Sequence, residues 1–221
     1  MSTLIVGVAA GAALGLLTGT LTGPTLRWLP EPPEPAEGKI AYADLATARF
    51  RGSVGTVSGL AVTLGTVLLP LAVLPLWFVL GTFAVLLAAI DARTTWLPLP
   101  LTRLAWAATG VAAVVAATFG GWAQLARSVG GFVAAAAVFG LVWLATRGGF
   151  GFGDVRFAPL VGAATATVSW TLLAWALVLG SLVGAAVGTG RLLTRRSGSF
   201  AYAPSILAGA YLAAIASWLT T

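Results

Sequence analysis

The sequence contains no cysteine and no histidine among its 221 residues. The first absence excludes disulfides, cysteine–zinc sites and thiol catalysis. The second excludes histidine-based metal sites, Ser-His triads and imidazole proton relays. Any catalysis by this chain must therefore come from carboxylates, hydroxyls, arginine, lysine or the backbone.

Charged residues are also scarce, at 8% of the sequence against about 25% in a soluble domain. Hydrophobic residues make up 59% of the chain, and the mean hydropathy is +0.99. This composition predicts an all-α polytopic membrane protein with one membrane domain. The net charge of +6 comes from basic residues scattered singly between apolar segments, which favours membrane topology over nucleic-acid binding.

About eight transmembrane helices are expected, because a span needs about 20 mostly apolar residues. The first is interpreted as uncleaved, because it lacks the basic start of a secretory signal. Six spans would result if 53–90 and 155–190 each formed one helix, but the basic loops would then fall on opposite faces. The predicted spans are 3–23, 53–72, 74–90, 99–119, 124–146, 155–169, 171–190 and 202–220.

The basic residues predict the orientation, because positive charge collects on the cytoplasmic side of a membrane protein. With the N-terminus outside, eleven of the twelve basic residues lie on the inner side and only Arg127 lies outside. Residues 1–23 are then the first span, 24–52 a short cytoplasmic loop, and 53–221 the membrane-embedded domain. Within the loop, 39–51 is compatible with a short interfacial helix, although a plain loop is favoured.

Acidic residues are rarer still, with six in the whole chain and only Asp91 and Asp154 after residue 44. A carboxylate at membrane depth costs at least about 2.5 kcal/mol, so it is usually retained for a function. The predicted topology places both on the cytoplasmic side. Two structural alternatives remain open here: Asp91 as a helix-end carboxylate paired with Arg93, and Asp154 as a helix N-cap.

Three short motifs carry a resemblance to a known family. Residues 151–156 (GFGDVR) resemble the GxGD signature of type IV prepilin peptidases, which are membrane aspartic proteases. Residues 90–98 (IDARTTWLP) are similar to the family's other aspartate with its downstream Leu-Pro pair, and 203–210 (APSILAGA) to its C-terminal proline-containing run. The resemblance implies that Asp91 and Asp154 are catalytic. It implies that the site is shaped by Gly151, Gly153, Leu97, Pro98, Arg156 and Pro204.

The chain departs from the family pattern in two places. Many members carry a four-cysteine zinc module after the first span, whereas this loop is short and has no cysteine. Because that region is linked to N-methylation of the product, its absence argues against N-methyltransferase activity. The family usually has an acidic residue after the Leu-Pro pair, where this chain has Leu99.

The resemblance implies an endopeptidase that removes the short basic leader of type IV pilin-like precursors at the cytoplasmic face of the plasma membrane. Such a role belongs to pilus assembly or protein secretion. Two neighbouring carboxylates share one proton, so one activates a water and the other protonates the scissile carbonyl. The acid and the base cannot be assigned between Asp91 and Asp154. No metal or cofactor is needed, and the expected partners are the precursor and the lipid bilayer.

Two other functions fit an isolated pair of membrane carboxylates. A proton-coupled transporter would use them as a relay, with acids near the bilayer midplane and inverted repeats. An inactive peptidase-like assembly protein would keep the fold without the chemistry. The absence of an obvious repeat and the placement of both acids near one face favour the peptidase.

Overall fold

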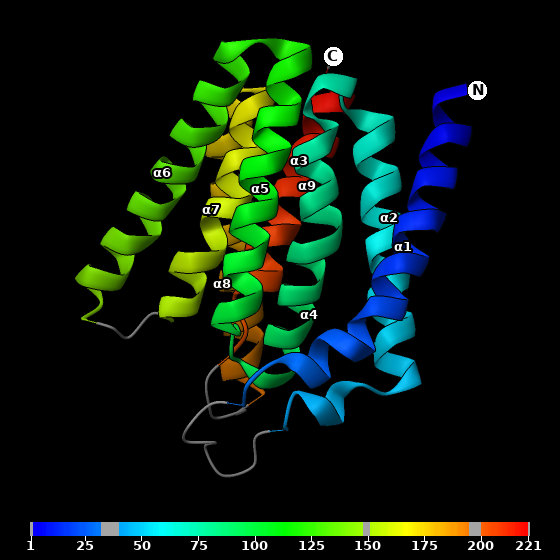
Figure 1. Ribbon diagram of the computed structural model, residues 1–221. Helices are drawn as coiled ribbons and strands as arrows, with labels where there is room; N and C mark the ends of the chain where they lie inside the picture. The colour runs from blue at the N-terminus through cyan, green and yellow to red at the C-terminus, as the bar shows by residue number, and fades with distance from the viewer. Residues whose placement is uncertain (1, 32–39, 148–150, 195–199, 221) are drawn as a thin grey trace.

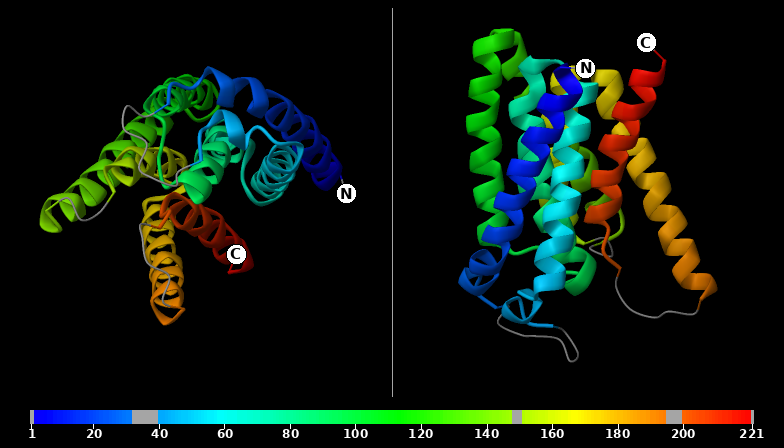
Figure 2. Two further views of the ribbon diagram at one scale, coloured as in Figure 1. Left: turned by 90° about the horizontal axis from the view of Figure 1, so that it is seen from below. Right: turned by 90° about the vertical axis from the view of Figure 1, so that its right-hand side faces the viewer.

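The computed structural model describes residues 2–31, 40–147, 151–194 and 200–220, and within these ranges the chain is helical and has no strand. Figure 1 shows the long helices side by side, with both chain ends at the same end of the bundle. Seen from below in Figure 2, α1 and α6 lie at opposite edges. The helices are α1 (Ser2–Trp28), α2 (Ala48–Leu68), α3 (Leu74–Val79), α4 (Val85–Thr94), α5 (Leu99–Gly120), α6 (Trp122–Ala145), α7 (Phe152–Val168), α8 (Trp170–Leu193) and α9 (Ala203–Leu219).

Within the described residues, five helical segments are long and apolar enough to cross a membrane, and α9 is a shorter apolar helix. One of the five combines α3, a π-helical turn (Leu80–Ala84) and α4 into a continuous run after the 3-10 turn Leu71–Val73. The block 53–90 is divided at Pro70, where the backbone becomes extended, and 155–190 is divided at Ser169. The five long segments are Thr3–Trp28, Leu71–Thr94, Leu99–Gly120, Trp122–Ala145 and Trp170–Leu193.

Several predicted boundaries were wrong by a few residues. The first helix continues to Trp28 rather than ending at 23, because Pro24 is accommodated within it. The second begins at Ala48, five residues early, because the Thr47 hydroxyl accepts a hydrogen bond from the Phe50 N–H and caps it. Both extensions shorten the connection between α1 and α2.

The described part of that connection is folded against the bundle. Before α2 begins, the connection contains one 3-10 turn, Ala43–Leu45. The plain loop that the sequence favoured is therefore only partly right. Tyr42 and Leu45 are buried, and the backbone N–H of Tyr42 donates to Glu31 Oε1 at 2.8 Å. Glu34, Glu37 and Lys39 lie outside the described residues.

Glycines set the closest helix contacts. A side chain on Gly131 of α6 would collide with the backbone of Gly162 on α7, and the reverse also holds. On α8, a Cβ added to Gly180 would lie 3.1 Å from the Ile206 Cα of α9, while one on Gly184 would collide with Tyr202. These two glycines of α8 therefore serve packing within the chain.

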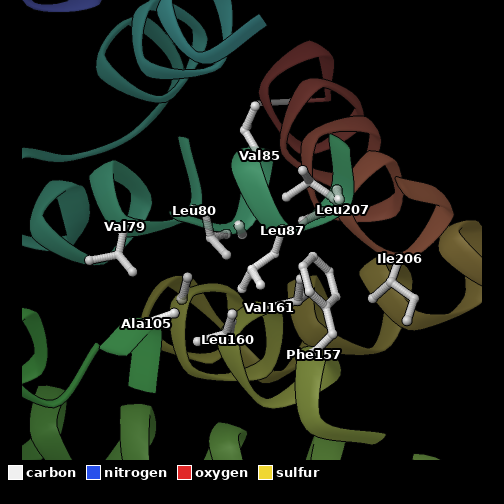
Figure 3. Packing of buried hydrophobic residues seen from close by; sticks show 14 of the residues in the cluster. Val79, Leu80, Val85, Leu87, Ala105, Phe157, Leu160, Val161, Ile206 and Leu207 are labelled. Carbon is white, nitrogen blue, oxygen red and sulfur yellow. The ribbon is translucent and has the colours of Figure 1, made fainter. Parts of the chain in front are cut away.

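The core is centred on α7, whose residues from Phe157 to Thr167 are all buried. Figure 3 shows side chains of α7 such as Phe157 and Val161 packed against Leu87 and Ile206. Two tryptophans hold this helix by their indole N–H groups: Trp77 donates to the Ala164 carbonyl at 3.2 Å and Trp106 to that of Arg156 at 3.0 Å. Five tryptophans at or near helix ends are exposed, which suits anchors at a lipid interface: Trp28, Trp96, Trp122, Trp170 and Trp218.

Candidate active site

Asp91 lies in the last turn of α4 and is 4% exposed. Its Oδ2 accepts a hydrogen bond from the Ala203 N–H at 3.1 Å, so it caps the first turn of α9 from a distant part of the chain. The first N–H groups of a helix lack partners within it and carry the positive end of its dipole. This helix end therefore orients the Asp91 carboxylate.

Asp154 lies in the first turn of α7 and is 8% exposed. The N-cap of α7 is Gly151, whose carbonyl accepts the Asp154 N–H at 3.1 Å. The alternative in which Asp154 is itself the N-cap therefore does not hold, because Phe152 and Gly153 precede it in the helix. Its Oδ1 is buried without a hydrogen-bond partner in the described part of the chain, which is costly unless another group binds there.

The Asp154 carboxylate lies close to Gly151. A Cβ added at this position would lie 2.9 Å from Asp154 Oδ2, closer than real Cβ atoms approach another heavy atom. Glycine therefore sets the place of the Asp154 side chain as well as the start of the helix.

The Leu-Pro pair meets the GxGD motif directly. Thr95 adopts φ 56°, a left-handed conformation that is rare for a β-branched residue, and it ends α4 one turn after Asp91. The chain then turns back so that Leu97 lies against Gly153, where an added Cβ would be 3.2 Å from Leu97 Cδ1. Pro98 follows as the N-cap of α5.

The charge of Asp91 acts on Asp154, so the two carboxylates lie within electrostatic range of each other. Tyr42 is also within range of Asp91. Burial, together with the charges of Glu31 and Asp91, raises the pKa of the Tyr42 phenol to about 12. The phenol is therefore protonated at neutral pH. No sequence signal marked this tyrosine, because it belongs to a loop without a motif.

Arg156 and Arg93 each follow one of the two aspartates by two residues, but their side chains have different surroundings. Arg156 places its guanidinium over the Phe152 ring at 4.6 Å from the centroid, and its carbonyl holds Trp106. Arg93 is exposed and lines a pocket with Asp44 and Arg49, whereas Asp91 is buried. Asp91 is thus a helix-end carboxylate, as one alternative from the sequence expected, but it is buried and its Oδ2 is tied to the Ala203 N–H of α9.

The third motif contributes through its backbone. Ala203 supplies the N–H that binds Asp91, and Pro204 follows in the first turn of α9, where a missing N–H is tolerated. Gly209 lies against the α8 backbone at Ala176 and Gly180, where any side chain would collide. The sequence suggested Pro204 as a site residue but not the role of the Ala203 amide.

The type IV leader peptidase family model matches residues 78–189, which is half of the chain. This chain belongs to that family. The matched region contains both aspartates of the leader peptidase and the Leu97–Gly153 contact, and it ends before α9. No curated protein and no solved structure matches the chain. Family membership and the long apolar helices make the protein a multi-pass membrane peptidase.

Proposed function

We propose that this leader peptidase is an aspartic endopeptidase whose dyad is Asp91 and Asp154. The proposal rests on one observation: the two buried carboxylates differ in their hydrogen bonding. One is held by the Ala203 N–H, and the other has an oxygen, Asp154 Oδ1, without a partner in the described chain. A partnerless carboxylate oxygen beside a second, oriented carboxylate suits the binding of a reacting water or a scissile carbonyl.

In the proposed reaction the pair shares one proton. The ionised carboxylate takes a proton from a bound water as the water attacks the scissile carbonyl. The protonated carboxyl donates to the carbonyl oxygen and later helps the amine leave. Histidine and cysteine are absent from the sequence, and the two buried carboxyls are the groups proposed for the acid–base chemistry.

The proposed substrate is a type IV pilin-like precursor, cut between its basic leader and its hydrophobic helix at the cytoplasmic surface of the plasma membrane. The proposed topology has eight spans, an outer N-terminus and the 24–52 connection inside. Asp91 ends α4 and Asp154 begins α7, so both lie near helix ends rather than helix centres. This position supports surface cleavage better than a relay at the bilayer midplane.

The test is co-expression of the chain with a pilin-like precursor, comparing wild type with Asp91→Ala and Asp154→Ala. Cleavage is expected only with the wild type, and both variants must be present in the membrane at comparable levels. Undiminished cleavage by either variant would contradict the dyad. The mass of the released mature chain also reports whether its N-terminus is methylated, which is not expected without the cysteine module.

A further inference from the structure

The helical run from α3 to α4 contains the π-helical turn Leu80–Ala84, which ends about two helical turns before Asp91. In a regular α-helix the Val85 N–H would donate to the Gly81 carbonyl, but here it donates to the carbonyls of Leu80 and Thr82. Turns of this kind accommodate one extra residue and occur frequently at functional sites. The Gly81 carbonyl thereby loses its α-helical partner.

A serine on the neighbouring helix binds this carbonyl. Ser58 of α2 is fully buried and donates its hydroxyl to the Gly81 carbonyl, and the buried Thr18 hydroxyl of α1 lies 3.1 Å from the Ser58 Oγ. Gly81 permits the close approach of α2, since a Cβ there would lie 2.7 Å from Val62 Cγ2. Leaving a buried carbonyl without a donor is costly, so this hydrogen bond stabilises the π-helical turn.

The π-helical turn sets the direction in which Asp91 points. One extra residue in a helix displaces every later side chain by one residue's rotation, about 100° at 3.6 residues per turn. In an uninterrupted α-helix, Asp91 would take the angular position of Ala92, which is exposed. Arg93 would likewise take that of Thr94, which is buried. The buried place of Asp91 beside the Ala203 N–H therefore depends on this turn.

The helix before the turn is fixed independently. Trp77 of α3 is fully buried, and its indole N–H donates to the Ala164 carbonyl of α7 at 3.2 Å. Because α3 is held in this way, a change of the π-helical turn into an α-helical turn would rotate α4 relative to α3. The carboxylate of Asp91 would rotate with α4.

We propose that Ser58 is a positioning residue of the active site, which stabilises the π-helical turn so that α4 presents Asp91 to Asp154. The inference rests on the proposed function and deepens it, because it names a residue that orients one member of the dyad. Ser58 acts through the Gly81 carbonyl. Loss of its hydroxyl favours the regular α-helical turn, which carries the carboxylate toward the exposed side of α4.

The direct test measures the rotation of α4 by cysteine labelling. The chain has no cysteine, so a single introduced one reports its own exposure through its rate of reaction with a water-soluble maleimide. The single-cysteine variants are Asp91→Cys, Ala92→Cys and Arg93→Cys, each made in the wild-type, Ser58→Ala and Thr66→Val backgrounds.

Thr66→Val is the matched control for Ser58→Ala. Thr66 is also a buried hydroxyl residue of α2, but its hydroxyl donates at 2.9 Å to the Val62 carbonyl of the same helix. Its removal therefore tests the loss of a buried hydroxyl without loss of the contact to the π-helical turn.

In Ser58→Ala, labelling should become several-fold faster at position 91 and several-fold slower at position 93, and stay fast at position 92. In Thr66→Val all three rates should match the wild type. Opposite changes at 91 and 93 identify a rotation, because general loosening would accelerate both. Unchanged rates in Ser58→Ala, or faster labelling at both 91 and 93, would overturn the proposal.

Cleavage of the precursor by the cysteine-free variants completes the test. Ser58→Ala should lower kcat about 10²-fold with little change in KM, because a small misplacement of a reacting group costs that much. Thr66→Val should keep the wild-type kcat. Labelling needs no cleavage, so its failure is distinct from failure of the aspartic mechanism. Rotation without a fall in kcat would contradict the catalytic role of Asp91 and, with it, the positioning role of Ser58.

Discussion

The carboxylate of Asp91 accepts a hydrogen bond from the backbone N–H of Ala203, 112 residues further along the chain. This contact joins the end of α4 to the start of α9 and links two motifs that are far apart in sequence. It also gives the two aspartates unequal structural roles, because Asp154 Oδ1 has no such partner within the described residues.

The unequal roles predict opposite effects on stability. Asp91→Ala removes the acceptor from the first turn of α9 and is expected to destabilise the protein by about 1 kcal/mol, as loss of a helix cap does. Asp154→Ala removes a buried oxygen without a partner and should leave the thermal midpoint unchanged or raised. Thermal unfolding in detergent measures both. A larger loss in Asp154→Ala than in Asp91→Ala would contradict the assignment of contacts.

Gly151→Ala is expected to lower kcat strongly, because its Cβ would displace the Asp154 carboxylate from which it lies 2.9 Å. The thermal midpoint should change little, since the neighbouring atom belongs to a side chain. Gly110→Ala is the matched control, because nothing lies within 4 Å of an added Cβ there. Equal kcat in the two variants would show that the place of the Asp154 side chain does not depend on Gly151.

The contact between Leu97 and Gly153 predicts a rescue. Gly153→Ala places a Cβ 3.2 Å from Leu97 Cδ1, so the Leu97 side chain must shift by a few tenths of an ångström, and we expect this to lower activity. Adding Leu97→Ala removes the opposing methyl groups, so the double variant should be more active than Gly153→Ala alone. The measurement is a double-mutant cycle on kcat/KM. Strictly additive losses would mean that the two motifs act separately.

Gly209→Ala is expected to disrupt the packing of α9 on α8, because the added Cβ would meet backbone atoms that cannot rotate away. We expect a loss of several kcal/mol or failure to accumulate in the membrane, since overpacking against backbone is costly. Gly190→Ala on α8, with open space around it, is the control. A normal thermal midpoint for Gly209→Ala would refute the close α8–α9 contact.

Much of the site could be predicted because its chemistry is rare in the sequence. With only two acids after residue 44, composition alone singled out Asp91 and Asp154 as candidates. The division of 53–90 and of 155–190 into two helices each was also expected from the sequence, and the structure has the breaks at Pro70 and Ser169. The Ala203 amide could not be found in this way, because every residue except proline carries a backbone N–H. The burial of Tyr42 could not be predicted from the sequence either, since it depends on how the α1–α2 connection folds back onto α4.

The predicted helix boundaries were wrong for a related reason. Hydropathy marks where apolar residues begin, whereas a helix begins where its first turn is capped. Thr47 caps α2, which begins five residues before the predicted span, and Gly151 caps α7 ahead of Asp154. For Asp154 the difference matters, because the third residue of a helix projects its side chain differently from an N-cap. Its carboxylate is thus left beside Asp91 instead of being used as a cap.

The most direct test of the dyad is cleavage of a purified pilin-like precursor by the purified protein in lipid vesicles, followed by mass spectrometry. Asp91→Asn and Asp154→Asn keep the shape of each side chain while removing the acid–base group. Each is expected to lower kcat at least about 10³-fold, because residues that act as a unit fail together. Gly110→Ala should cleave at the wild-type rate. Cleavage at a near wild-type rate by either asparagine variant would contradict the aspartic mechanism.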